Sequence, residues 1–379
     1  METFIKNIIK KSSDLWQIFE KIDNNQKLSQ NDGIILYNSN EFLSIGAIAD
    51  FARVKRLEIL GESYKKDYVY WINNHHLNLT NVCEGTCKFC AYKRKEGEKG
   101  AFSYTLDKAV AYLEVQVSQA AKEIHIVSAL NPKFDLDFYK KLLEECRRIL
   151  PNAHIQAFTA VELDYLAKIS GLSLEETIKE LVKFGLGSIP GGGAEIFAEN
   201  IRQKVCPEKI SGQKWLEIME IVHSSGLKSN VTMLTGIGET SEDKINHMLA
   251  VRDLQDKTGG FMTFIPLFCH YENTELSSAN APTGIEILKD YAISRLMLDN
   301  IPHIKAFRIQ TGTKLAQISL SFGVDDIDGT VMEEKITRMA GSSDPDALKR
   351  EEIEHLIKRA GKIPLERDTL YNTAGYTVI

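Results

Sequence analysis

The stretch Cys83-Glu-Gly-Thr-Cys-Lys-Phe-Cys90 places three thiols within eight residues, with the spacing C-x3-C-x2-C. Thiolates are soft ligands that bind zinc, copper(I) and iron–sulfur clusters. A structural zinc site has four ligands in two pairs, and no second cysteine pair follows in this chain. A cubane iron–sulfur cluster normally takes four cysteines, so three thiolates leave one iron open to another ligand. The spacing therefore favours a 4Fe–4S cluster, with a zinc site or three inert core thiols as the alternatives.

Composition limits the possible partners. The chain has 379 residues, of which 43% are hydrophobic, and its formal net charge is −6. Because there is no basic surplus to neutralise phosphates, we expect no nucleic-acid partner. No apolar run is long enough to span a bilayer and the N-terminus lacks an apolar leader, so we expect no membrane partner. The clustered thiols indicate a reducing compartment, and we expect a cytoplasmic protein.

Short apolar runs alternate with helical patterns from residue 71 onward. Eight strands and helices over about 250 residues predict an α/β fold, a (β/α)8 barrel of parallel strands, with a doubly wound open sheet as the alternative. We expect a helical cap at 1–70, the barrel at 71–330 and a helical extension at 331–379. The expected strands are His75–Thr80, Glu123–Ser128, His154–Phe158, Leu186–Ile189, Lys228–Leu234, Phe261–Leu267, Ile304–Ile309 and Ile318–Phe322.

Polar and glycine-rich motifs follow these strands, at the end where parallel barrels build active sites. Gly191-Gly-Gly193 lacks the P-loop spacing, and its bare backbone predicts either close approach to a ligand or a plain tight turn. Glu195 and Glu239 follow glycine turns, where a carboxylate binds ribose hydroxyls or an ammonium group, or favours a helix N-terminus. Ser128 and Glu162 follow the second and third strands.

Two basic side chains are candidates for contact with a substrate. His270 follows the sixth strand, where it serves as a substrate or acid–base group, or has a structural role. Strand alternation points Arg308 into the barrel, where a guanidinium binds a carboxylate or pairs with a barrel acid. The mixed charges of Lys93–Lys99 predict a solvated loop, and an aspartate group at 325–328 predicts a solvated turn. The other cysteines, expected to be inert, are Cys146, Cys206 and Cys269.

The cysteine spacing resembles that of the radical S-adenosylmethionine superfamily, in which C-x3-C-x2-C carries a 4Fe–4S cluster. The resemblance implies that Cys83, Cys87 and Cys90 bind the cluster and that S-adenosylmethionine chelates the open iron. It also implies that Phe89 lies near the adenine. Further stretches are similar to the branch that handles menaquinone and deazaflavin precursors: Thr80-Asn-Val-Cys83, Phe89-Cys-Ala-Tyr92, Phe158-Thr-Ala-Val-Glu162 and Ser188-Ile-Pro-Gly-Gly-Gly-Ala-Glu-Ile-Phe197.

Within that branch the sequence is most similar to the aminofutalosine synthase family, over nearly all of residues 71–372. The resemblance implies a transferase in menaquinone biosynthesis. It adds the 5′-deoxyadenosyl group of S-adenosylmethionine to 3-[(1-carboxyvinyl)oxy]benzoate and yields 6-amino-6-deoxyfutalosine. His270 and Arg308 are then the candidates for the substrate carboxylates. The candidates for contact with S-adenosylmethionine are Phe89, Ser128, Glu162, Gly191, Gly192, Glu195 and Glu239.

The same resemblance implies an electron donor such as flavodoxin or ferredoxin. Two turns depart from the family's pattern, Thr235-Gly-Ile-Gly238 and Cys269-His-Tyr271. Three alternatives stay open: a cyclic dehypoxanthine futalosine synthase, a subunit of the deazaflavin-precursor synthase, and a non-catalytic metal-binding module.

Overall fold

The computed structural model describes residues 2–9, 13–278, 281–342 and 347–373. Within these ranges a curved sheet of seven parallel strands follows the chain order, which excludes the doubly wound alternative and confirms the α/β barrel class. The strands are β2 (Asn74–Leu77), β3 (Glu123–Ile126), β4 (His154–Ala157), β5 (Ser188–Ile189), β6 (Lys228–Thr235), β7 (Phe261–Phe268) and β8 (His303–Ile304).

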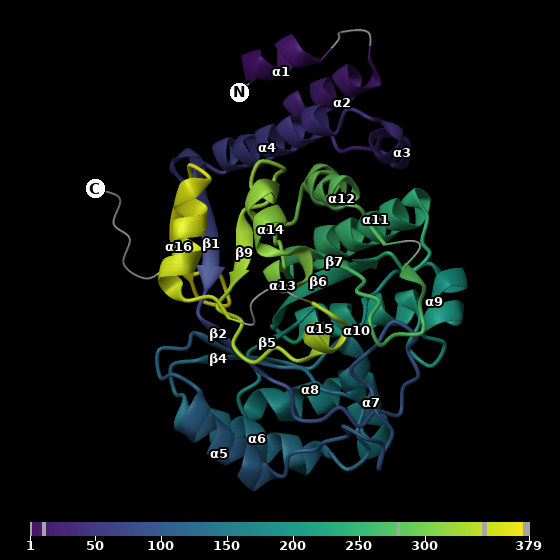
Figure 1. Ribbon diagram of the computed structural model, residues 1–379, viewed down its shortest axis with the longest axis vertical. Helices are drawn as coiled ribbons and strands as arrows, with labels where there is room; N and C mark the ends of the chain where they lie inside the picture. The colour runs from purple at the N-terminus through teal and green to yellow at the C-terminus, as the bar shows by residue number, and fades with distance from the viewer. Residues whose placement is uncertain (1, 10–12, 279–280, 343–346, 374–379) are drawn as a thin grey trace.

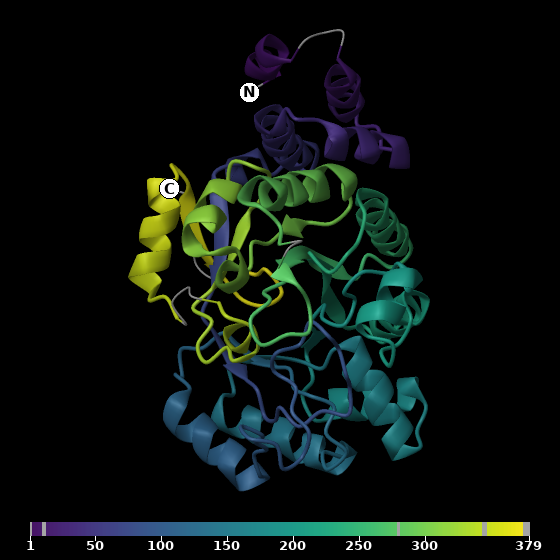
Figure 2. The same cartoon turned by 45° about the vertical axis from the view of Figure 1, so that its right-hand side comes forward.

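Helices cover the outside of this sheet (Figures 1 and 2). They are α5 (Leu106–Gln116), α6 (Leu136–Ile149), α7 (Ala160–Ser170), α8 (Leu174–Lys183), α9 (Glu199–Val205), α10 (Gly212–Ser224), α11 (Ser241–Thr258) and α12 (Gly284–Met297). Side-chain caps start several of them: Thr159 and Thr240 each form a capping box with the acid three residues later. These caps fix where the loops above the strands end and the helices begin.

The element that follows β8 at the open side of the sheet is β9 (Asp326–Gly329), which pairs in a separate side sheet and meets the barrel through isolated bridges, and not the predicted strand at 318–322. Asp326 bridges to Lys305 beside β8, and Met332 bridges to His75 on β2. The prediction of a strand at 318–322 is wrong, because the chain there completes α14 (Thr313–Ser319) and a turn. Its buried residues follow helical spacing. The predicted seventh strand is likewise cut short, because residues 308–311 form the short helix α13 (Arg308–Thr311).

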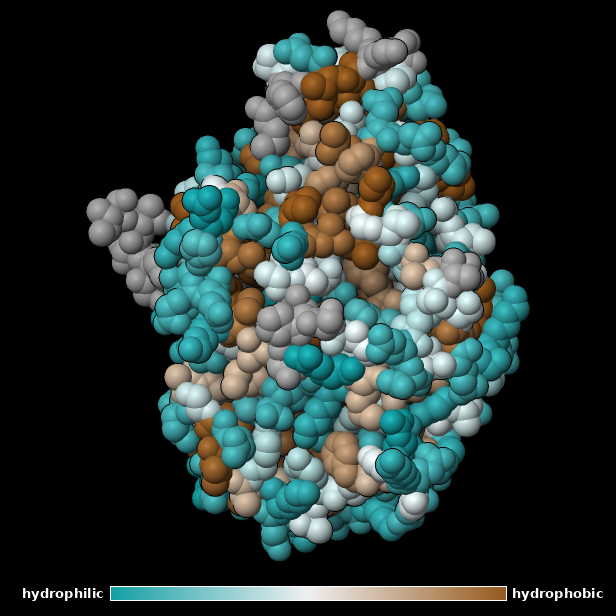
Figure 3. All heavy atoms as spheres, viewed as in Figure 1, coloured by the Kyte–Doolittle hydropathy of each residue, from teal (hydrophilic) through white to brown (hydrophobic). Residues whose placement is uncertain are grey.

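Two further layers flank the barrel. At one end lie α1 (Glu2–Ile8), α2 (Asp14–Asp23), α3 (Gln30–Asn38), α4 (Phe42–Ile59) and the short 3-10 helix η1 (Ser63–Lys65). Figure 3 shows apolar side chains gathered over these helices and the adjoining barrel surface. At the side, β1 (Tyr68–Ile72) pairs in parallel with both β9 and β10 (Ile363–Arg367), next to α16 (Arg350–Arg359).

The aspartates at 325–328 are part of this side sheet. Asp326 is fully buried and accepts a hydrogen bond from Arg367 at 2.6 Å, while Asp325 pairs with Arg295 at 3.0 Å. The expectation of a solvated turn is therefore wrong, because each carboxylate has a buried cationic partner. No helix among the described residues is long and apolar enough to cross a membrane.

Candidate active site

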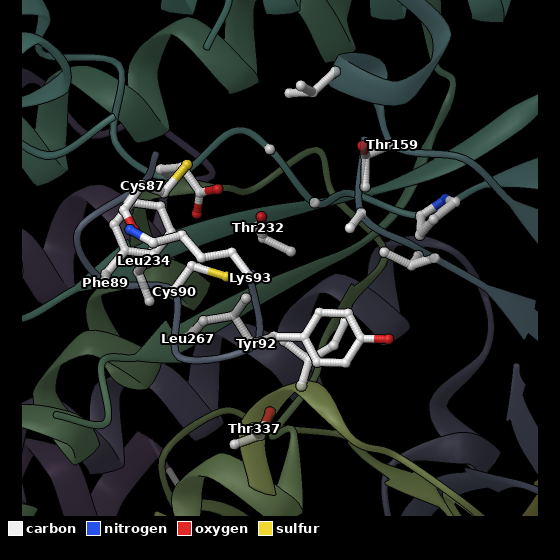
Figure 4. A pocket seen from close by; sticks show the side chains of 18 of the residues that line it. Cys87, Phe89, Cys90, Tyr92, Lys93, Thr159, Thr232, Leu234, Leu267 and Thr337 are labelled. Carbon is white, nitrogen blue, oxygen red and sulfur yellow. The ribbon is translucent and has the colours of Figure 1, made fainter. Parts of the chain in front are cut away.

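A cavity of about 620 Å³ opens at the carboxyl ends of the strands. Figure 4 shows Cys87, Phe89 and Cys90 on one side of it and Thr159 on the other. The predicted site residues that line it are Cys83, Cys87, Phe89, Cys90, Ser128, Glu162, Gly191, Gly192, Glu195 and His270. Glu239 and Arg308 are not among the residues that line it. The sequence motifs thus converge on one space that is large enough for two small ligands.

The cysteine loop follows β2 and is held by hydrogen bonds from its own backbone and from two lysines. The Cys83 N–H donates to the Arg94 carbonyl at 2.9 Å. The Lys93 ammonium donates to the Cys87 carbonyl at 2.7 Å, and the Lys95 ammonium donates to the Cys83 carbonyl at 3.1 Å. The lysine-rich loop is exposed from residue 95 to residue 99, as predicted, and Lys93 and Lys95 also brace the thiol-bearing segment.

The donor set fits an iron–sulfur cluster. Burial raises the pKa of Cys87 to about 12 and also raises that of Cys90, so a bound cluster would replace the protons of these two thiols. Among the described residues, no three His, Cys, Asp or Glu side chains are grouped tightly enough to hold one ion. A zinc ion needs sulfur ligands about 3.8 Å apart. A cubane instead takes one thiolate on each of several irons, so its ligands lie farther apart.

A buried ion pair lies beside the cysteines. Lys209 donates to a carboxylate oxygen of Glu195 at 2.5 Å, and its ammonium lies 5.3 Å from the centroid of the Phe89 ring. Burial alone would lower the pKa of Lys209, but the Glu195 carboxylate outweighs it and raises that pKa above its ordinary value. Lys209 thus stays charged and also favours the thiolate form of Cys87.

The glycine turn after β5 is tight because of the neighbouring strand. A Cβ on Gly191 would lie 2.5 Å from the Cα of Val231 on β6, and a Cβ on Gly192 would meet Thr159 at 2.9 Å. The Thr232 hydroxyl donates to the Gly191 carbonyl at 2.8 Å. The missing side chains therefore let the turn pack against β6, which leaves its backbone facing the cavity.

Glu162 joins the ends of two strands. Its carboxylate accepts from the Ser128 N–H at 2.9 Å and from the Thr159 N–H at 2.7 Å. Burial raises its pKa, while these two N–H groups oppose that shift. Ser128 in turn accepts from the Leu79 N–H at 2.9 Å through its hydroxyl. This chain of bonds positions the loops after β2, β3 and β4 around the cavity.

The two basic candidates occupy different places. The His270 ring is hydrogen-bonded to the Gln310 carbonyl at 3.0 Å, which fixes it at the cavity wall. Arg308 is 1% exposed on α13, outside the cavity lining. The Glu239 carboxylate accepts from the Gly236 N–H at 2.8 Å and thereby closes its own turn.

Several residues that line the cavity were not among the predicted site residues. Lys209, Tyr92, Asn230 and Thr232 all line the cavity. Asn230 and Thr232 are two residues apart on β6, so both side chains point to the same face of the sheet. Strand alternation could therefore have predicted them. Lys209 follows α9 in a loop, and only the folded chain brings it to Glu195.

A parallel barrel with three cysteines on the loop after its first strand defines a radical S-adenosylmethionine enzyme. The family models agree: that of the Radical SAM superfamily matches residues 77–251, and that of the CofH/MqnC C-terminal region matches residues 258–377. The chain therefore belongs to the radical SAM superfamily, in the branch that carries this C-terminal region. Enzymes of this superfamily use a 4Fe–4S cluster and S-adenosylmethionine.

Curated relatives with more than one activity in their names are similar over most of the chain. An aminodeoxyfutalosine synthase of Thermus thermophilus is 38% identical, over 93% of this chain and 94% of the relative. A cyclic dehypoxanthine futalosine synthase of Streptomyces coelicolor is 34% identical, over 95% and 88%. Among solved structures, the [FeFe]-hydrogenase maturase HydG aligns with a TM-score of 0.72 at 15% identity, over 98% of this chain and 78% of that one. That identity supports a shared fold alone.

Proposed function

We propose that this chain is an aminofutalosine synthase. It adds the 5′-deoxyadenosyl group of S-adenosylmethionine to the vinyl double bond of 3-[(1-carboxyvinyl)oxy]benzoate and forms 6-amino-6-deoxyfutalosine. The adenosyl group stays in the product, so S-adenosylmethionine is a co-substrate. The observation that carries the proposal is one loop that presents Cys83, Cys87 and Cys90 to a cavity roomy enough for both substrates. The similarity to the Thermus thermophilus enzyme over nearly its whole length supports the choice of reaction.

The cluster, when bound by the three cysteines, supplies the electron that splits S-adenosylmethionine into methionine and a carbon radical. The chain itself positions and shields the reactants. The Gly191–Gly192 backbone, the Glu195 carboxylate and Phe89 line the space beside the cysteines, where the first two would bind the polar groups of S-adenosylmethionine and Phe89 would contact its adenine. The cavity wall from β6 and β7 includes the apolar side chains of Leu234, Ile265 and Leu267, which help to exclude water from a radical that reacts with most bonds.

A product analysis tests this proposal. The protein is reconstituted with iron and sulfide without oxygen, reduced, and given S-adenosylmethionine labelled in its adenosyl group together with the enolpyruvyl benzoate. We expect the label in a product that also contains the aromatic ring, measured by mass spectrometry. Free labelled 5′-deoxyadenosine without a coupled product contradicts the proposal. It favours the cyclase, which abstracts a hydrogen atom; a relative with that name is 34% identical over 95% of this chain.

The partners and location are proposals as well. We propose a low-potential electron donor such as flavodoxin or ferredoxin, and the exposed Lys88 and Lys95 beside the cysteines offer positive charge to an acidic donor. Clustered thiols that bind iron need a reducing compartment, which supports a cytoplasmic location. The boundaries at residues 70 and 330 stay predictions.

A further inference from the structure

The barrel interior carries two histidines to which no role has been given above. His76 on β2 and His125 on β3 are direct partners in the parallel register, so both side chains leave the sheet on the same face. Their rings stack with centroids 4.5 Å apart and planes 12° apart. Both line the cavity from within the strands, below the loop that bears the cysteines. We call these two residues the histidine pair.

The histidine pair has spare hydrogen-bonding capacity. Nδ1 of the His125 ring lies 3.6 Å from a carboxylate oxygen of Glu123, and the Glu162 carboxylate is near enough to interact with His125 electrostatically. Within the described part of the chain, no hydrogen bond to the His76 ring is present. Burial holds the pKa of His76 well below its ordinary range, and His125 adds to that effect. The His76 ring is therefore neutral, and one of its nitrogens carries a proton that needs an acceptor.

One cation, Lys305, lies near the histidine pair and favours an anionic ligand, while the Glu123 carboxylate beside the pair opposes it. The ammonium of Lys305 is close enough to lower the pKa of His76. The same ammonium forms an ion pair with Asp328, with Nζ 3.1 Å from Oδ1. The Glu123 carboxylate raises the pKa of His76, whereas His75 lowers it, as Lys305 does. Barrel interiors are normally filled by branched apolar side chains, so a polar layer with two imidazoles is a departure that a polar ligand explains.

We propose that the histidine pair binds the ring carboxylate of the benzoate substrate. This inference rests on the proposed function. The vinyl group must lie within about 3–3.5 Å of the attacking carbon, and S-adenosylmethionine is held at the cysteine loop. The ring carboxylate is at the opposite end of the substrate, so it points away from that loop and down into the barrel. Imidazole N–H groups there form charge-assisted hydrogen bonds with it, while His270 at the wall is left for the other carboxylate.

The test compares two ligands, with and without the ring carboxylate, and histidine variants inside and outside the cavity. The variants are His76→Asn and His125→Asn, and His75→Asn is the matched control, because the His75 ring is bonded to the Tyr112 hydroxyl at 2.7 Å and is absent from the cavity lining. Each oxidised, cluster-loaded protein is titrated by calorimetry with the enolpyruvyl benzoate and with 2-phenoxyacrylate, which lacks the ring carboxylate. No turnover occurs without reductant, so the dissociation constant is read directly.

We expect the two cavity variants to bind the benzoate about tenfold or more weakly, because a hydrogen bond to a charged group is lost. Their affinity for 2-phenoxyacrylate and their iron content should equal those of the wild type. Equal losses for both ligands, or no loss for either, overturn the inference while the proposed function stands. If either variant fails to fold, His76→Phe and His125→Phe replace it, because a phenyl ring keeps the stacked shape without a hydrogen-bond donor and should show the same selective loss for the benzoate. A wild type that does not bind the benzoate at all overturns both proposals.

Discussion

The Lys209 ammonium lies 2.5 Å from a carboxylate oxygen of Glu195, and both side chains are largely buried. Phe89 covers the ammonium from the cysteine loop, at 5.3 Å from its ring centroid. Three separate loops therefore meet at one charge: the cysteine loop, the glycine turn and the segment after α9. The ion pair fixes the glycine turn relative to the thiols.

Lys209→Met tests the importance of this pair. The change leaves the Glu195 carboxylate buried without a partner, so we expect a loss of about 3–5 kcal/mol in the free energy of unfolding. The double variant with Glu195→Gln should recover much of that loss, as measured by chemical denaturation. The control is Lys214→Met, which removes an exposed pair with Glu217 at 3.8 Å and should cost less than about 1 kcal/mol. Equal effects of both methionine variants would contradict this interpretation.

Single cysteine substitutions test the cluster site. Cys83→Ala, Cys87→Ala and Cys90→Ala should each lose most of the bound iron and the visible absorbance after anaerobic reconstitution, because each removes one of three ligands. Cys146→Ala is the control: that thiol is fully buried on α6 and should leave the iron content unchanged. Full iron in any one of the first three variants excludes that residue as a ligand.

Gly191→Ala tests the close contact with β6. The added Cβ would lie 2.5 Å from the Cα of Val231. The atoms that it meets belong to the backbone of β6, which cannot turn aside as a flexible side chain can. We expect the free energy of unfolding to fall by about 1–3 kcal/mol and S-adenosylmethionine to bind more weakly. Gly284→Ala is the control, because its nearest neighbour would be Leu315 at 3.9 Å at the start of α12. It should be neutral or stabilising by up to about 1 kcal/mol.

His223 should make stability depend on pH. Its ring is hydrogen-bonded to Thr258 at 2.7 Å and to Ser229 at 2.8 Å, and burial lowers its pKa from 6.5 to about 4. The unfolded chain therefore binds more protons between pH 6.5 and 4, so the stability is full above pH 6.5 and is lost as the pH falls through that window.

The measurement is chemical unfolding at a series of pH values. His223→Gln should flatten the slope between pH 6.5 and 4. The exposed His355→Gln should leave it unchanged. An unaltered slope in the first variant shows that the acid sensitivity comes from other groups.

The sequence predicted the barrel and most cavity residues because both depend on local pattern. Parallel strands end at a common edge, so the residues after β2, β3, β4 and β5 had to meet there. The pattern failed where an apolar run fits two structures. Residues 304–309 and 318–322 were predicted as strands, but β8 ends at Ile304, α13 begins at Arg308, and α14 runs to Ser319. Arg308 was expected in the cavity and is instead buried outside its lining for this reason.

Other features depend on contacts between distant segments. Alternation along each strand indicates that His76 and His125 point inward, but their stacking requires the register of β2 against β3. Lys209 and Glu195 have no motif that relates them, and the distance between them is set by the packing of α9. Pairwise geometry of this kind cannot be read from composition or spacing.

The side sheet has a consequence for the order in which the molecule is assembled during synthesis. β1 precedes the first barrel strand, yet both of its partners, β9 and β10, leave the ribosome after the last one. The backbone N–H and C=O groups of β1 therefore have no strand partner until translation is nearly finished. Contacts between segments so distant along the chain also form slowly. A chaperone that shields Tyr68–Ile72 on the nascent polypeptide would raise the yield of active enzyme, and early stop codons before Ile363 would lower it.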